Sequence, residues 1–336
     1  MKESKQITIY DVAKKAGVSP ATVSRVLNEP DKVAIEKKDA VLKAIDELKF
    51  VPKADAVANA RKAYKKIGVV APFFTQPSFM ERLRGICSVL AAQHYEVVIY
   101  TINTVEDLNN YVTSLVTANR VDGLIFLCVK LEKKMEKLLH NAEFPVCFVE
   151  NQVDDFDNVT IDNYQGGKKA AEYFYELGCK KPGFLGEGSF FDYAVHATEE
   201  RLDGYKNFFS SKGIELDEDN IWLGEFTEQN LDEGIESFLA KKDKPDCVFC
   251  SSDVIASKFV HMARLAGINI PGQMKVLGFD DIDISEHIGL SSIRQHLEES
   301  GRQAGELVID RIKNPKKSPV TVTLQLKIME RLTSKN

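Results

Sequence analysis

The sequence predicts a small all-α head followed by an α/β core that is built from doubly wound parallel sheets. Three short helical patterns lie within the first 50 residues. From Ile67 onward, apolar runs of strand length alternate with amphipathic stretches of helix length, which is typical of parallel strands covered by helices on both faces. A chain of 336 residues also exceeds the usual size of one domain, so two or three units are expected.

The composition is that of a globular protein, with 44% hydrophobic and 28% charged residues. No run approaches the ~20 apolar residues that a membrane-spanning helix needs, so no membrane partner is expected. The first segment, MKESKQITIYDVAKK, lacks the apolar core of a secretory signal. We therefore expect a cytoplasmic location.

The six cysteines are scattered along the chain, and four lie in apolar strand-like runs, as expected for reduced thiols. Cys247 and Cys250 form a CxxC pattern inside the run DCVFCS, but no second pair and no nearby histidine completes a metal site. We expect neither a metal nor a cofactor.

The charge is distributed unevenly. Residues 1–66 hold 15 Lys/Arg and 9 Asp/Glu, a net charge of +6, whereas the remaining 270 residues hold 29 and 41, a net charge of −12. A basic head gains affinity for phosphate by releasing counterions, while an acidic body is repelled by it. The asymmetry alone is a weak signal, because a solvated basic segment would show the same balance.

The first two helices of the head carry recognisable end signals. Thr8 and Asp11 have the spacing of a capping box at the start of a helix, and Gly17 can take the left-handed conformation that ends it. Ser19 is a favoured N-cap for a second helix, with Pro20 at the first helical position. The short turn at Gly17 predicts a helix-turn-helix.

The second helix has one apolar face and one face of small and polar side chains. Its inward positions are Val23, Val26 and Leu27, and a third helix follows with Val41, Ala44, Ile45 and Leu48 inward. The small and polar residues of the opposite face are Ala21, Thr22, Arg25 and Asn28. This face lets the backbone approach a surface, where Arg25 can bind a guanine edge and hydroxyls can bind phosphates or bases. A helical bundle with a solvated face is the alternative.

The core lacks the motifs of an enzyme. No GxGxxG follows the first apolar run, no GxxxxGK[ST] occurs, and no Ser/His/Asp grouping has the context of a nucleophile elbow. We therefore expect no catalytic residues. A free-standing solute-binding protein is a further alternative, but it would need a secretory signal and would not carry a basic head.

The exact amino-acid sequence of the head is more specific than its pattern of helix ends and apolar positions. The segments ITIYDVAKKAGVSPATVSRVLN and VLKAIDELKFVP closely resemble the head of the LacI/GalR family of bacterial transcription repressors. The core resembles the two-lobed, periplasmic-binding-protein-like core of that family. The resemblance implies a DNA-binding domain at 1–51, a hinge at 52–66 and an effector-binding and dimerisation core at 67–336. The implied lobes are about 67–162 with 292–322, and about 163–291 with 323–332.

The family resemblance also implies the function and its residues. A homodimer would bind double-stranded operator DNA, and a small effector, a sugar or sugar derivative, would bind between the lobes. A purine-like effector or a protein co-regulator stays open. The implied DNA-binding residues are Thr8, Tyr10, Ser19, Pro20, Ala21, Thr22, Ser24, Arg25, Asn28 and Asn59. The implied effector-binding residues are Phe79, Glu150, Arg201, Phe226, Ser252, Asp280 and Gln295.

Three features of this assignment depend on structure. Arg201 could instead form an ion pair with Glu199 or Glu200 on a helix surface, and Asp280 could be a helix cap. Val195 and Ala197 stand where several relatives place polar ligand contacts, so these two positions do not indicate which effector binds.

The hinge departs from the family pattern at Asn59. Relatives have a leucine there, which wedges into the minor groove of DNA. An amide is a poor wedge because it must shed water to enter the base stack. This departure puts DNA bending in question and leaves DNA binding unaffected.

Overall fold

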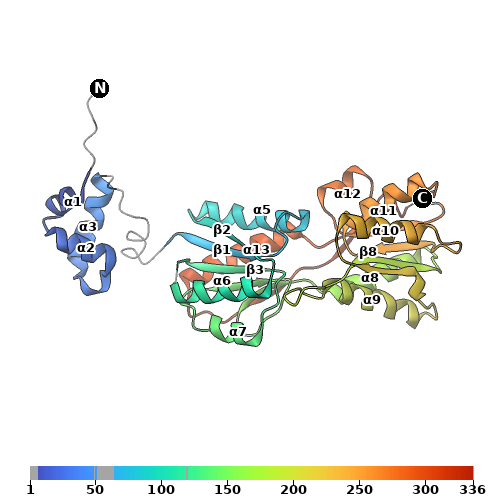
Figure 1. The fold of residues 1–336 in the computed structure, drawn as a ribbon, viewed down its shortest axis with the longest axis horizontal. Helices are drawn as coiled ribbons and strands as arrows, with labels where there is room; N and C mark the ends of the chain where they lie inside the picture. The colour runs from blue at the N-terminus through green and yellow to red at the C-terminus, as the bar shows by residue number, and fades with distance from the viewer. Residues whose placement is uncertain (1–6, 49, 51–63, 119, 336) are drawn as a thin grey trace, which may run out of the picture.

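The computed structural model describes residues 7–48, 50, 64–118 and 120–335. Its head is a three-helix unit formed by α1 (Ile9–Ala16), α2 (Pro20–Asn28) and α3 (Ile35–Leu48), with a 3-10 turn at Pro30–Lys32. Its core consists of two α/β lobes, which Figure 1 shows as the β1–α13 lobe and the β8–α9 lobe. None of the helices in the described part of the chain combines the length and apolar character that crossing a bilayer requires.

The local signals of the head are confirmed. The Asp11 carboxylate accepts hydrogen bonds from the Thr8 amide at 2.8 Å and the Thr8 hydroxyl at 2.7 Å. Gly17 has a φ of 66°, which is the left-handed region, and the Ser19 hydroxyl accepts a bond from the Thr22 amide at 3.1 Å. The residues expected to face inward from α2 and α3 form one apolar core with Val12 and Ala13 of α1: Val23, Val26, Leu27, Val41, Ala44 and Ile45, with partly buried Leu48 packed against them.

The first lobe, which we call the N-lobe, has a six-stranded parallel sheet in the order β2-β1-β3-β4-β5-β11. The strands are β1 (Lys66–Ala71), β2 (Glu96–Thr101), β3 (Gly123–Leu127), β4 (Val146–Val149), β5 (Asp157–Thr160) and β11 (Thr321–Thr323). The helices are α5 (Pro77–Ala92), α6 (Val105–Ala118), α7 (Lys133–Leu139) and α13 (Leu297–Lys313). Because helices cover both faces, β3 and β4 are buried along their whole length.

The second lobe, the C-lobe, repeats this topology in the order β7-β6-β8-β9-β10-β12, with only β12 antiparallel. Its strands are β6 (Pro182–Glu187), β7 (Ile221–Gly224), β8 (Cys247–Cys250), β9 (Lys275–Asp280), β10 (Ser291–Arg294) and β12 (Lys327–Met329). Its helices are α8 (Asn163–Glu176), α9 (Ala197–Ser211), α10 (Glu228–Leu239), α11 (Asp253–Leu265) and α12 (Asp283–His287), with a 3-10 turn at Glu218–Asn220.

The lobe boundaries expected at 291/292 and 322/323 need small corrections. β10 pairs with β9 and β12, so the second crossing between lobes follows Arg294. β11 pairs with β5 as far as Thr323, so the third crossing follows that residue. Both strands are too short and too polar to stand out in the sequence as apolar runs.

Strand β1 begins at a fixed point. The Asp122 carboxylate accepts hydrogen bonds from the Tyr64 amide at 2.9 Å and the Lys66 amide at 3.2 Å. β1 is paired with β2 on one side and β3 on the other. Its residues from Ile67 to Ala71 are buried. The last described residues of the linker are therefore tied to the N-lobe sheet.

Glycines allow two helix pairs to cross closely. A Cβ on Gly301 of α13 would lie 1.9 Å from the Arg82 carbonyl oxygen of α5, and a Cβ on Gly167 of α8 would lie 1.7 Å from the Arg201 carbonyl oxygen of α9. Only a residue without a side chain fits at such a contact. A glycine contact thus positions the backbone of one arginine in each lobe, Arg82 in the N-lobe and Arg201 in the C-lobe.

Candidate functional site

A cavity of about 240 Å³ lies between the lobes. Several of its residues stand at or just beyond the carboxyl ends of parallel strands, including Phe73 after β1, Cys128 after β3, Glu187 at the end of β6 and Ser252 after β8. In both sheets the strand order reverses between these pairs, β1/β3 and β6/β8. That reversal is where doubly wound sheets bind ligands.

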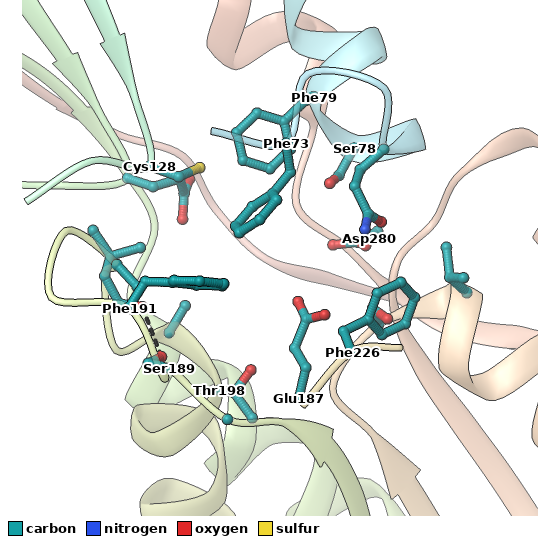
Figure 2. Close-up of a pocket in the computed structure, with 18 of the residues that line it drawn as sticks. Phe73, Ser78, Phe79, Cys128, Glu187, Ser189, Phe191, Thr198, Phe226 and Asp280 are labelled. Carbon is teal, nitrogen blue, oxygen red and sulfur yellow. Dashed lines mark hydrogen bonds between the residues drawn. The ribbon is translucent and has the colours of Figure 1, made fainter. Parts of the chain in front are cut away.

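The structure brings all seven sequence-predicted effector residues to this cavity: Phe79, Glu150, Arg201, Phe226, Ser252, Asp280 and Gln295. Val195 and Ala197 also line it. Figure 2 shows that both lobes contribute, with Phe73, Phe79 and Cys128 on one side and Glu187, Thr198 and Phe226 on the other. The geometry fits a ligand-binding site, while a ligand contact for each residue stays a prediction.

Arg82, which the sequence did not single out, lines the cavity and contacts residues from two other parts of the chain. It is buried, and its Nη2 atom donates to Gln295 Oε1 at 3.0 Å and lies 3.3 Å from the Glu150 carboxylate. Gln295 in turn donates from Nε2 to the Asp280 carboxylate. This chain of contacts connects α5 of the N-lobe to the end of β9 in the C-lobe.

Arg201 is buried, so the surface ion pair that the sequence left open is not its environment. Its Nε atom donates to Asn163 Oδ1 at 2.9 Å, and its Nη1 atom donates to the Ser251 carbonyl at 2.7 Å. The guanidinium carbon lies 3.6 Å from the centre of the Phe279 ring, which is a cation–π contact. Burial lowers the pKa of Arg201, against the attraction of Asp280.

Asp280 lies at the carboxyl end of β9 with an unusual backbone. Its φ is 119°, and the next residue, Asp281, has a φ of 60°, a region that non-glycine residues rarely occupy outside functional sites. Asp280 is not a helix cap, because the N-cap of α12 is Ile282. Burial raises the pKa of Asp280 to about 6, although Arg201 and Arg82 oppose the rise.

Glu187 was also missed, although it ends an apolar run that was expected to be a strand. Burial raises its pKa to about 7, and the neighbouring charge of Asp280 acts in the same direction. Its position at a carboxyl strand end is the signal that could have found it. Figure 2 shows its side chain extending into the cavity between the rings of Phe73, Phe191 and Phe226.

Aromatic rings form much of the cavity wall. Phe73 of the N-lobe lies edge-on to Phe79 at 6.2 Å and contacts Phe191 of the C-lobe at 5.8 Å between ring centres. Phe73 and Phe191 are 38% and 41% exposed, and Phe190 is 61% exposed. Exposed rings that line a concave site are typical of ligand-binding surfaces. The sequence predicted Phe79 and Phe226 but missed these three.

A loop of the C-lobe reaches into the N-lobe beside the cavity. Tyr193, between β6 and α9, is only 3% exposed and packs in an N-lobe core cluster with Val129 and Phe126. Ala194 forms an isolated antiparallel bridge with Val129. We call residues 188–196 the strap, because they hold the lobes together outside the chain crossings.

The CxxC pattern does not converge on one point. Cys247 faces the core cluster that contains Cys179, whereas Cys250 faces the cluster on the other side of β8. The side-chain ligand atoms of Cys179, Asp246 and Cys247 lie within 4.8 Å of one another. The Asp246 carboxylate accepts hydrogen bonds from the amides of Lys180 and Lys181, which gives it a structural role.

The head presents its predicted DNA-binding residues on its surface. Ala21, Arg25 and Asn28 of α2 are exposed, and Tyr10 is 71% exposed. The remaining members in the described range are exposed or half-buried: Thr8, Ser19, Pro20, Thr22 and Ser24. Asn59 lies outside the described residues. The arrangement offers a polar, closely approachable helix face, as groove recognition requires.

Comparison with known proteins agrees with this geometry. Residues 8–53 match the family model "Bacterial regulatory proteins, lacI family", and residues 171–334 match "Periplasmic binding protein-like domain". Catabolite control protein A of Staphylococcus xylosus is 30% identical over 88% of this chain and 89% of its own length. The HTH-type transcriptional repressor PurR of Photobacterium profundum is 29% identical over 91% of this chain and 92% of its length.

A solved structure extends the comparison to the whole fold. The complex of the transcriptional regulator CelR with cellobiose superposes with a TM-score of 0.70 and 26% identity, covering 98% of this chain and 100% of that one. The helix-turn-helix, the paired sheets and these relatives lead to one conclusion: the chain belongs to the LacI family of bacterial regulatory proteins and is a DNA-binding transcriptional regulator.

Proposed function

We propose that the chain is a repressor whose operator binding is controlled by a small hydroxylated effector, a sugar or sugar derivative, in the cavity between the lobes. The observation that carries this proposal is that buried Arg82, Arg201, Asp280 and Gln295 line the same cavity as several aromatic rings. Charged hydrogen-bonding groups suit sugar hydroxyls, and the rings suit the apolar face of a sugar. The related CelR binds cellobiose.

The proposed division of labour follows the chain. Residues 1–51 bind DNA, residues 52–66 connect, and residues 67–336 bind the effector and dimerise. The seven predicted cavity residues contact the effector, and α2 reads the major groove. Because its proposed target is operator DNA, we place the regulator in the cytoplasm, and its role is binding rather than catalysis.

A purine-like effector is the second candidate, because Phe73 and Phe191 face the cavity and can stack on a planar base. A thermal-shift screen of the full-length protein with sugars, sugar phosphates and purines separates the two, since a ligand that binds the folded state raises the melting temperature. Stabilisation by a sugar, coupled to changed operator binding, supports the proposal. Stabilisation by purines alone would replace it.

The regulator acts as a homodimer on a near-palindromic operator. One helix-turn-helix contacts too few base pairs for useful discrimination, and two-fold pairing of heads doubles the readout. A monomeric mass in solution, together with tight binding to a single half-site, would contradict this.

A further inference from the structure

The ionisable side chains of the cavity are unbalanced in favour of acids. Two cationic residues line it, Arg82 and Arg201, against four carboxylates at Glu150, Glu187, Glu225 and Asp280. Both arginines already have protein partners, Arg82 at Glu150 and Gln295, and Arg201 at Asn163 and Ser251. The described lining therefore has an excess of negative charge, which disfavours an anionic ligand such as a sugar phosphate.

Among the lining carboxylates that are not exposed, Glu187 is the one for which the described residues provide no partner, whereas Glu225 is exposed to solvent. It accepts no side-chain hydrogen bond from the part of the chain that the structure describes, unlike Glu199 nearby, which accepts from Ser189 at 2.7 and 2.8 Å. Its backbone is fixed, because the Glu187 amide donates to Ser251 Oγ at 3.4 Å. Its side chain extends into the cavity (Figure 2). A shielded carboxylate without a donor costs free energy, which a bound cation would recover.

The surroundings of Glu187 suit an organic cation rather than a metal ion. Phe73, Phe191 and Phe226 line the same cavity, and the faces of such rings attract ammonium groups. A hard metal ion would need several oxygen ligands at once, whereas the other buried carboxylates of the described lining are engaged: Glu150 with Arg82, and Asp280 with Gln295. An ammonium group needs one carboxylate and tolerates apolar neighbours.

We propose that the effector carries a protonated amine that binds the Glu187 carboxylate, so that the effector class is an amino sugar with a free amine. This inference rests on the proposed function and narrows it from sugars in general. The pKa of Glu187 is raised to about 7 because burial and the charge of Asp280 disfavour its ionised form. A cation bound beside it would stabilise that ionised form. The hydroxyls of the same ligand would bind Arg201, Asp280 and Gln295, which line the same cavity.

The test compares matched sugars on the full-length protein by isothermal titration calorimetry at pH 7. Glucose, galactose and cellobiose are each compared with the analogue that has a free amine, namely glucosamine, galactosamine and fully deacetylated chitobiose. The N-acetylated amino sugars control for size without charge. We expect at least one free amine to bind about tenfold or more tightly than both of its uncharged counterparts, as for a charge-assisted hydrogen bond.

Variants assign the preference to one carboxylate. Glu187→Gln should abolish the tenfold preference for the amine, whereas Glu236→Gln, at an exposed position of α10 in the same lobe, should retain it. Circular dichroism and the melting temperature of Glu187→Gln verify its folding, and Glu187→Asp, which keeps the charge, should retain part of the preference.

The outcomes separate this inference from the proposed function. If uncharged sugars bind as tightly as their amines, the inference is overturned and the sugar-binding function stands. The same holds if the amine preference persists in folded Glu187→Gln. If no member of any pair binds, while the protein still binds its operator, both the amine inference and the sugar class are overturned.

Discussion

The Lys130 amide of the N-lobe donates a hydrogen bond of 2.8 Å to the Tyr193 carbonyl of the C-lobe strap. This bond and the Val129–Ala194 bridge join the lobes by contacts additional to the three chain crossings. The strap therefore provides a contact between lobes that ligand binding can strengthen or break.

The strap makes Tyr193 a stability determinant of both lobes. Because its ring is buried in the N-lobe core, Tyr193→Ala should lower the free energy of unfolding by about 3 kcal/mol. Tyr193→Phe removes only the hydroxyl, which donates to the Asn103 carbonyl at 3.4 Å, and should cost about 1 kcal/mol or less. Urea denaturation measures both values. Equal effects of the two variants would show that the ring contributes nothing.

The glycine contacts predict a steric effect at the cavity. Gly167→Ala would place a methyl group 1.7 Å from the Arg201 carbonyl oxygen, so α8 and α9 must separate and Arg201 must move. We expect a loss of about 2–3 kcal/mol in unfolding free energy and weaker effector binding. In Gly305→Ala the nearest atom is a Val89 side-chain carbon at 3.2 Å, and the cost should be smaller. Chemical denaturation and calorimetry compare the two, and similar losses would contradict this account.

Stability should depend on pH through Glu187. Its pKa is raised to about 7 in the folded protein from an ordinary value of 4.5. The folded state then binds more protons than the unfolded state between these values, so stability falls as pH rises from about 4.5 to about 7. Glu187→Gln removes this contribution and should gain on the order of 2 kcal/mol relative to the parent between pH 5 and pH 8. Urea titrations at both pH values measure the change, and parallel pH profiles would refute it.

Arg25 tests base recognition by the head. If its exposed guanidinium binds a guanine edge, Arg25→Ala should lose about 1–3 kcal/mol of discrimination between operator and random DNA. Lys14→Ala, at an exposed position of α1, should leave the discrimination unchanged. Binding measured at one fixed salt concentration on both DNAs decides this. An equal loss on the two DNAs for Arg25→Ala would make it a phosphate contact.

Asn59 tests the hinge. Asn59→Leu supplies the apolar wedge that relatives carry, so it should tighten operator binding and increase DNA bending. Its effect on effector affinity should be nil, because the cavity residues are unchanged. Operator affinity and bend angle of the two proteins provide the comparison. No gain from leucine would mean that the hinge does not enter the groove.

Features that depend on residues close together in the sequence were predicted, whereas features set by contacts between distant segments were not. The capping box at Thr8, the turn at Gly17 and the cap at Ser19 depend on neighbours within three or four residues, and each was predicted correctly. The long apolar strands were visible for the same local reason. The three-residue strand β11 was not, because its position is set by pairing with β5, and a C-terminal strand in the range of β12 was expected only from the family resemblance.

The cavity illustrates the same limit. Family resemblance located Arg201 and Asp280, but Arg82 was missed because its partner Gln295 is 213 positions away. Phe73, Phe190 and Phe191 were missed because an exposed ring in a loop has no periodic pattern. What fixes these residues is the fold itself, through strand ends that converge only after both lobes have formed.

Strand β1 links the point where the linker joins the N-lobe directly to the cavity. It runs from Lys66, where the linker is tied to Asp122, to Ala71, two residues before Phe73 at the cavity. Its six residues span roughly 20 Å, and pairing on both edges prevents it from bending on its own. If ligand binding tilts the N-lobe, β1 moves with its sheet as a rigid unit. The point where the linker joins Lys66 then turns by the same angle.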